Sequence, residues 1–476
     1  MSKKEINQNT EAFRDQISTV TNEGNRVWIY PKKPSGRFYN ARTIVSILLL
    51  AFLFGVPFIK VNGHQFILFN ILERKFILFG IPFGPHDFHL FGLAMIAVIV
   101  SIFLFTVVYG RIFCGWICPQ TIFMEMVFRK IEYFIEGDAN RQRTLNQMPM
   151  NGEKFFKKSV KHFIFFALSF VIANFFLAYI IGMDQLITII TDPITAHTGG
   201  LFAITIFSGI FYWVFSYFRE QACTIVCPYG RLQGVMLDQN SIVIAYDDVR
   251  GEPRAKIKKD EPRNDKGDCI ECHLCVDVCP TGIDIRNGTQ LECVNCTACI
   301  DACDNVMDKI GKPRGLIRYA SKNEIETRVR KIFTPRALGY TFVLTLLLSL
   351  ITFLLINRTE VELTILRTPG ILFQEQPDNK ISNLYDVKIV NKTFNEFPVS
   401  LKLENINGEI KMIGTENLNV EPQGIAEAKF LVILSKDDIQ NMKTPLDISV
   451  SSSGEIIDVI RTSFLGKVNR TLKGSN

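Results

Sequence analysis

Eight cysteines in two short runs have the clearest chemistry in this chain. Each run has the spacing C-x2-C-x2-C-x3-C, and Pro280 follows the first run. Bacterial ferredoxins use this spacing to hold two 4Fe–4S clusters, and the fourth cysteine of each run binds the other cluster. The sequence therefore predicts two cluster sites that exchange their fourth ligands. The first is Cys269, Cys272, Cys275 and Cys303, and the second is Cys293, Cys296, Cys299 and Cys279.

Two other uses of closely spaced cysteines fit this segment less well. Zinc sites also contain C-x2-C pairs, but they usually combine two separated pairs rather than two runs of four. Disulfides belong to oxidising compartments, whereas the charge pattern described below places this segment in the cytosol. We therefore interpret both runs as iron–sulfur ligands.

A second cysteine motif, C-x3-C-P, occurs twice at an offset of 109 residues, at 114–119 and 223–228. In a helix, cysteines four residues apart share one face, and the proline bends or ends the helix just after them. Soft sulfur ligands favour Cu(I), zinc or an iron–sulfur centre. We predict a redox or metal site, for which Cu(I), zinc and an iron–sulfur centre all remain candidates, although buried packing is the alternative. Its members are Cys114, Cys118, Cys223 and Cys227.

Several cofactor motifs are missing from the sequence. There is no G-x-G-x-x-G after a predicted strand, no Walker A lysine motif and no C-x-x-C-H haem attachment motif. We therefore expect neither a nicotinamide site nor covalent haem, and electrons must come from an unknown cytosolic donor.

Five apolar stretches are long enough to cross a membrane, which takes about 20 residues. Both C-x3-C-P motifs follow the end of such a stretch, one after the second and one after the fourth. The first four stretches therefore resemble a duplicated helical hairpin whose copies run the same way. The predicted spans are 42–60, 88–110, 160–182, 199–218 and 337–356.

Segments rich in lysine and arginine alternate with segments poor in them along the loops between these spans. The segments 1–41, 111–159 and 219–336 are basic, whereas 183–198 has no lysine or arginine. Basic loops stay on the cytosolic side, so the N-terminus and the cysteine-rich segment are predicted to be cytosolic. The formal net charge of +6 comes mostly from these loops and needs no nucleic-acid partner to explain it.

We expect a multi-domain membrane protein: an α-helical bundle of five spans, an inserted two-cluster ferredoxin domain and a C-terminal all-β immunoglobulin-like sandwich. Short alternating strands and turn residues predict that sandwich. The expected parts are a polar, extended cytosolic arm (1–41), four membrane helices in two hairpins (42–219), the cytosolic ferredoxin domain with its flanks (220–336), the fifth membrane helix (337–357) and the extracytoplasmic sandwich (358–476).

This order of parts resembles the cytochrome c oxidase accessory proteins of the FixG/CcoG type over nearly the whole chain. The resemblance implies a bacterial cytoplasmic (inner) membrane protein whose β domain is periplasmic. It also implies a role in assembly of a cbb-type cytochrome c oxidase, with oxidase subunits or assembly factors as partners. The family's proposed activity is reduction of Cu(II) to Cu(I). Its cluster ligands map onto the eight ferredoxin cysteines, and its membrane motif maps onto the other four.

Together these features predict a membrane iron–sulfur electron-transfer protein and a cupric reductase. A cytosolic donor reduces the clusters, and electrons pass to copper bound by the four membrane cysteines. Two alternatives stay open: an electron relay to a quinone or a protein partner without copper, and a non-enzymatic scaffold for oxidase assembly.

Overall fold

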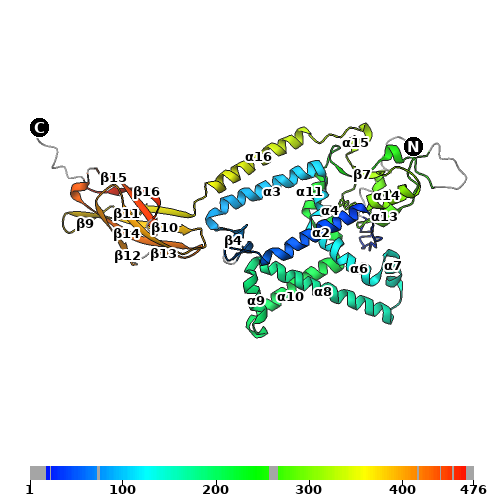
Figure 1. Ribbon diagram of the computed structural model, residues 1–476, viewed down its shortest axis with the longest axis horizontal. Coiled ribbons are helices and arrows are strands. Elements are labelled where there is room, and N and C mark those ends of the chain that lie inside the picture. Colours follow the sequence, from blue (N-terminus) through cyan, green and yellow to red (C-terminus); the bar gives the residue numbers. More distant parts are fainter. Residues whose placement is uncertain are drawn as a thin grey trace. The chain divides into compact units, whose positions relative to one another are not determined.

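The computed structural model describes residues 18–21, 23–71, 75–256, 266–414, 418–439, 441–452 and 455–467. The chain forms two compact units (Figure 1). The first comprises Met1–Ile59 and Gly92–Ile351, and the second comprises Lys60–Phe91 and Thr352–Asn476. All twelve cysteines belong to the first unit. Residues 1–17 of the predicted arm lie outside the described part of the chain.

Within the described ranges, five helices are long and apolar enough to cross a membrane, which confirms the predicted number of spans. The third begins before the predicted residue 160, because Asn151 caps its N-terminus and Glu153 pairs with Lys157 one turn later. The five are α2 with η2 (Arg37–Phe58), η3 with α3 (Pro85–Tyr109), α8 (Gly152–Ile181), η5 with α10 and η6 (Ile194–Phe218) and α16 (Pro335–Ile356).

Shorter helices connect these spans in the first unit. The segment 119–136, made of α5, η4 and α6, packs against α8 and α10, and Phe128 stacks on Phe215 with ring centroids 4.8 Å apart. The connecting helices are α4 (Ile112–Trp116), α5 (Pro119–Thr121), the π-helix η4 (Ile122–Phe128), α6 (Arg129–Glu136), α7 (Ala139–Gln147), α9 (Met183–Thr191), the π-helix η7 (Ala222–Val226), α11 (Pro228–Met236), α12 (Asp248–Gly251) and α15 (Lys322–Thr327).

The ferredoxin segment is small and is attached to the first span. Its helices are α13 (Leu274–Asp277) and α14 (Ala298–Lys309), and β6 (Val243–Tyr246) pairs antiparallel with β7 (Ile317–Ala320). Asp301 on α14 accepts hydrogen bonds from the backbone N–H groups of Phe38 (3.1 Å) and Tyr39 (2.8 Å). These groups have no partner inside α2, so the ferredoxin helix caps the first span.

The described part of the N-terminal arm is largely exposed but makes specific contacts with the rest of the first unit. Lys32 N donates to Asp277 O of the ferredoxin segment (2.7 Å), and Lys33 N donates to Asp138 Oδ1 (2.8 Å). The Arg26 guanidinium lies 3.9 Å from the Trp28 ring centroid and pairs with Glu220 at 3.2 Å. The arm therefore connects the ferredoxin segment to the bundle through backbone hydrogen bonds and aromatic packing that its polar composition concealed.

The second unit contains the predicted β-sandwich. One sheet has the order β12-β14-β10-β8, with β9 also on β10, and the other has the order β13-β11-β15-β16. Ile381, Tyr385, Phe430 and Phe464 are completely buried between the sheets. The strands are β8 (Val361–Arg367), β9 (Gln374–Gln376), β10 (Lys380–Asn391), β11 (Phe397–Leu403), β12 (Gly408–Ile413), β13 (Leu418–Val420), β14 (Ile425–Ser435), β15 (Lys443–Ser452) and β16 (Glu455–Leu465).

The loop between the first two spans belongs to the same unit as the sandwich. The buried Asp87 carboxylate pairs with Arg358 at 2.9 Å and Lys392 at 3.1 Å, and His64 stacks on Phe394. Burial makes both ion pairs sensitive to loss of either partner. The strands of this loop are β1 (Lys60–Val61), β2 (His64–Gln65), β3 (Ile67–Asn70), β4 (Lys75–Leu78) and β5 (Ile81–Phe83).

Candidate metal and electron-transfer site

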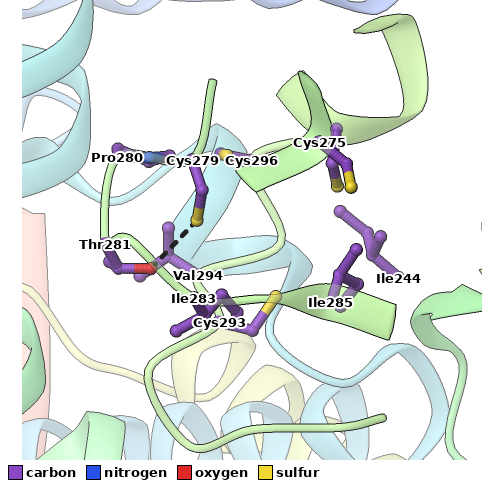
Figure 2. A pocket seen from close by; sticks show the side chains of 11 residues that line it. Ile244, Cys275, Cys279, Pro280, Thr281, Ile283, Ile285, Cys293, Val294 and Cys296 are labelled. Carbon is purple, nitrogen blue, oxygen red and sulfur yellow. Dashed lines mark hydrogen bonds between the residues drawn. The ribbon is translucent and has the colours of Figure 1, made fainter. Parts of the chain in front are cut away.

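Two cavities receive the eight ferredoxin cysteines. Cys303 lies with the first three cysteines of the first run, and Cys279 lies with those of the second run. Figure 2 shows Cys279 and Cys293 on different sides of the second cavity. Four soft sulfurs around one buried cavity are the donor set that a 4Fe–4S cluster needs. The first cavity holds Cys269, Cys272, Cys275 and Cys303, and the second holds Cys279, Cys293, Cys296 and Cys299, with Cys275 also on its wall.

The backbone around both cavities bends in the same unusual way. In the first run, Glu271 (φ 52°) and His273 (φ 59°) flank the second cysteine in the left-handed region, and Asn295 (φ 54°) and Thr297 (φ 68°) do the same in the second run. Such conformations cost energy for residues other than glycine. Turns that alternate between the two hands direct backbone N–H groups into one concavity, which suits an anionic cluster.

Burial makes these cysteines poor acids in the absence of a cluster. It raises the pKa of Cys275, Cys293 and Cys303 to about 12. Neighbouring cysteines add to the rise because one thiolate disfavours another. Cluster binding must therefore release thiol protons at neutral pH.

The two cavities differ in their exposure. Cys272 and His273, at the first cavity, are exposed, whereas Cys296, at the second cavity, is 8% exposed. The His273 ring nitrogen lies 3.0 Å from Arg286 Nη2. The first cavity therefore has one exposed cysteine that a soluble partner can approach, whereas the cysteines of the second cavity are buried or half-buried.

The four cysteines of the two C-x3-C-P motifs come together in the first unit. Cys114 and Cys223 pack into one buried cluster. Burial raises the pKa of Cys114 to about 11 and that of Cys223 to about 12, and Cys118 and Cys227 lie near enough to raise both pKa values further. The two repeats thus supply two sulfurs each to one region.

The local structure of these motifs differs from the expected pair on one helix. Cys114 lies in α4, but Cys118 has extended backbone (ψ 124°) and is the N-cap of the helix that begins at Pro119. Cys223 and Cys227 repeat this arrangement at η7 and α11. Each proline occupies the first helical position, where its missing N–H costs nothing, so it begins a helix instead of ending one. The second sulfur of each motif therefore lies at the positive end of a helix dipole.

Gln233 is a neighbour of this site that sequence reasoning missed. The Cys114 Sγ–H donates to Gln233 Oε1 at 3.1 Å, and Arg111 Nε donates to the same oxygen at 3.1 Å. Gln233 Nε2 in turn donates to Thr106 Oγ1 at 3.3 Å. Gln233 follows the second motif but contacts the first, so no local spacing could have indicated it.

The first motif also lies directly against the second cluster cavity. Cys114 and Cys296 share one buried cluster of side chains. Arg42 connects the two segments, because its Nε donates to Gly115 O (2.7 Å) and its Nη1 donates to Cys296 O (3.2 Å). A Cβ at Gly115 would collide with the backbone of Asn295. Glycine at this position thus permits backbone contact between the motif and the ferredoxin loop.

Buried ion pairs hold the second motif to the helix that follows the first. Arg219 donates to both carboxylate oxygens of Glu132, at 3.1 and 2.9 Å, and Lys161 lies 3.4 Å away. Burial opposes the charge of Glu132, but Arg219 and Lys161 outweigh it and lower its pKa to about 2. Arg219 and Glu220 come just before Cys223, so these ion pairs fix the position of the second motif.

No three Cys, His, Asp or Glu side chains in the described ranges are grouped tightly enough to hold a single metal ion. The ferredoxin cysteines are included in that finding, because a cubane separates its ligands more widely than one ion does. Cys114, Cys118, Cys223 and Cys227 form what we call the four-cysteine site, and their sulfurs are the donors that soft metals prefer.

Three sequence families match parts of this chain. A 4Fe–4S dicluster domain matches residues 218–322, and a 4Fe–4S binding domain matches residues 91–136. The family described as an IG-like fold at the C-terminus of FixG matches residues 351–467. These regions contain the ferredoxin cysteines, the first C-x3-C-P motif and the β-sandwich, respectively.

Curated relatives match most of the chain. The "Nitrogen fixation protein FixG" of Rhizobium meliloti is 32% identical over 461 residues, which cover 86% of each chain. "Protein RdxB" of Cereibacter sphaeroides is 36% identical over 383 residues, covering 76% of this chain and 79% of the relative. A crystal structure of a FixG-related protein from Vibrio parahaemolyticus covers 23% of this chain at 19% identity, with a TM-score of 0.21.

The matched lengths, the two cysteine-lined cavities and the five apolar helices agree with one another. The chain is a member of the FixG family, and it is a membrane-associated iron–sulfur protein of electron transfer.

Proposed function

We propose that this protein delivers electrons from a cytosolic one-electron donor to Cu(II) at the four-cysteine site and releases Cu(I) for assembly of a cbb-type cytochrome c oxidase. The supporting observation is the backbone contact between Gly115 and Asn295, which joins the first C-x3-C-P motif to the second cluster cavity. Electron transfer needs short distances, and this is the place where the two cysteine systems meet.

The residues of the chain suggest the order of events. When bound, the two 4Fe–4S clusters supply one-electron carriers. The exposed surface at Cys272 and His273 receives the donor, and the loop at Cys296 presents the second cavity to Cys114. Cys114, Cys118, Cys223 and Cys227 are the proposed copper ligands, and their sulfurs must move closer together when the ion binds, because no three of them are grouped tightly enough in the described structure.

The chemistry at the four-cysteine site balances simply. Each Cu(II) gains one electron, the cytosolic donor loses one, and the thiol protons displaced by copper pass to water. Thiolate ligands favour Cu(I) over Cu(II) because both the sulfur and the reduced ion are soft. Cys114 is buried and Cys223 is half-buried, which limits access of water to the reduced ion.

The basic segments support a cytosolic N-terminus and ferredoxin segment, and the proposal accordingly has a bacterial inner-membrane protein whose sandwich is periplasmic. Oxidase subunits or assembly factors are the proposed recipients of Cu(I), and the sandwich is the proposed docking domain.

The proposal is tested with the double variant Cys114→Ser/Cys223→Ser in membranes, assayed for Cu(II) reduction. We expect the reduction to be lost while the absorption of both ferredoxin clusters stays at the wild-type level. Retained reduction would instead favour the copper-free relay to a quinone or a protein partner. A variant that lacks residues 358–476 tests the scaffold alternative. If the protein were only a scaffold, neither this variant nor the wild type would reduce Cu(II).

A further inference from the structure

The Gln233 carboxamide lies in an unusual place for an uncharged polar group. It is completely buried, and its oxygen accepts from both Cys114 and Arg111. Burying an amide without partners costs a few kcal/mol, about 1–3 by mutational data. Its hydrogen bonds to the thiol, to Arg111 and to Thr106 offset this cost.

The duplicated architecture shows that the fold does not require a glutamine here. The residue 109 positions earlier, at the same place after the first proline, is Met124, and it is buried in an apolar cluster. The helix that follows the first motif therefore packs well with a methionine at this position, a side chain of similar length with no amide group. The amide of Gln233 contributes contacts to Cys114 rather than general packing.

We propose that Gln233, held in place by Arg111, is a positioning residue that fixes the Cys114 sulfur at the four-cysteine site and favours Cu(I) there. This inference rests on the proposed function. It makes Cys114, which packs with Cys296 in one buried cluster, the ligand whose environment is set by the other repeat.

Two physical effects follow from this contact. A sulfur already held in one direction loses less freedom when copper binds, so the affinity of the site rises. Copper displaces the thiol proton, while Gln233 Oε1 continues to accept from Arg111 Nε and so holds the guanidinium beside the sulfur. The Arg111 cation favours the more negative thiolate–Cu(I) state over thiolate–Cu(II).

The test substitutes Gln233→Met, which gives the second repeat the residue of the first, and uses Met124→Leu as the matched control. Gln233→Glu is a second variant that keeps an oxygen for Arg111 but adds a negative charge beside the sulfur. Full-length protein with both clusters is titrated with Cu(I) against a Cu(I) chelator. A separate titration with Co(II) follows the sulfur-to-cobalt charge-transfer band as a copper-independent probe.

We expect both Gln233 variants to weaken Cu(I) binding about 10–100-fold, the range found when groups that orient a metal ligand are removed. The cluster spectra and the Met124→Leu affinity should stay at wild-type values. Cu(I) affinity within about twofold of wild type in both variants would overturn the proposal. If wild-type protein binds Co(II) but not Cu(I), the proposed function fails, and the Co(II) affinities of the variants then decide the role of Gln233. Failure to bind either ion would overturn both.

Discussion

Gly115 lies against the backbone of Asn295 so closely that a Cβ on Gly115 would overlap the Asn295 carbonyl group. Gly115 follows Cys114, the first cysteine of the first C-x3-C-P motif. Asn295 lies between Cys293 and Cys296, which line the second cluster cavity. This contact joins the backbones of the two cysteine systems. Arg42 reinforces it by donating to carbonyl groups on both sides.

Gly115→Ala should separate these two segments. The added methyl meets backbone, which cannot rotate away, so overpacking of about 1–3 kcal/mol is expected. Because electron transfer falls steeply with distance, the rate of Cu(II) reduction by pre-reduced protein should drop. Stopped-flow absorbance of the clusters measures that rate.

Gly209→Ala is the control for this substitution, since a Cβ at Gly209 meets nothing within 4 Å. It should leave the rate unchanged without lowering the thermal stability, because alanine is favoured over glycine in the interior of α10. A wild-type rate in Gly115→Ala would contradict the assigned junction.

The Asp301 cap predicts a structural link between the ferredoxin segment and the first span. Asp301→Ala removes the acceptor for two N–H groups at the start of α2 and should cost about 1 kcal/mol. We expect faster amide hydrogen exchange at Phe38 and Tyr39, read by mass spectrometry of the peptide that contains them. Asp308→Ala, at an exposed position on the same helix, should leave that exchange unaltered.

The buried Glu132–Arg219 pair predicts a particular dependence on pH. Glu132→Gln leaves a buried arginine without its charged partner and should cost about 3–5 kcal/mol. The pKa of Glu132 is about 2 in the folded protein and ordinarily 4.5. A lowered folded-state pKa gives stability that is complete above 4.5 and is lost as pH falls toward 2. The penalty of Glu132→Gln should therefore be equal at pH 8 and pH 6.

Thermal unfolding of both proteins in detergent at these two pH values measures that penalty. A penalty that shrinks between pH 8 and pH 6 would mean that the carboxyl group already gains a proton in this range, contrary to the ion pair described.

The difference in exposure between the two cavities predicts different access from water. A soluble paramagnetic complex should broaden the electron paramagnetic resonance signal of the first cluster more than that of the second, because Cys272 is exposed and Cys296 is buried. Separate Cys272→Ser and Cys299→Ser variants assign the two signals. Equal broadening would remove the basis for donor entry at the first cavity.

Much of the fold could be predicted from local sequence patterns. The length of an apolar stretch is enough to identify a membrane span, and alternation of apolar and polar residues is enough to identify the strands of the sandwich. Both predictions were confirmed. The spacing of the cysteines also led to the family that the comparisons show. These patterns need no information about contacts between distant segments.

The remaining features depend on such contacts. Gln233 meets Cys114 across 119 residues, and Asp301 caps a helix 262 residues away at Tyr39. Neither has a spacing signal. The role of Pro119 was misjudged for another reason: a proline after a cysteine pair can end one helix or begin the next, and only the backbone conformation of Cys118 distinguishes the two.

We propose that electrons leave the ferredoxin clusters for copper through the four-cysteine site, which consists of Cys114, Cys118, Cys223 and Cys227. The most direct measurement is an anaerobic single turnover, in which fully reduced protein is mixed with Cu(II) while cluster absorbance and Cu(I) formation are recorded together. In wild type we predict cluster oxidation and Cu(I) formation at one rate, with one electron for each copper ion. In Cys114→Ser/Cys223→Ser, with both clusters present, neither should occur at that rate. Unchanged cluster oxidation and Cu(I) formation in this variant would contradict the account.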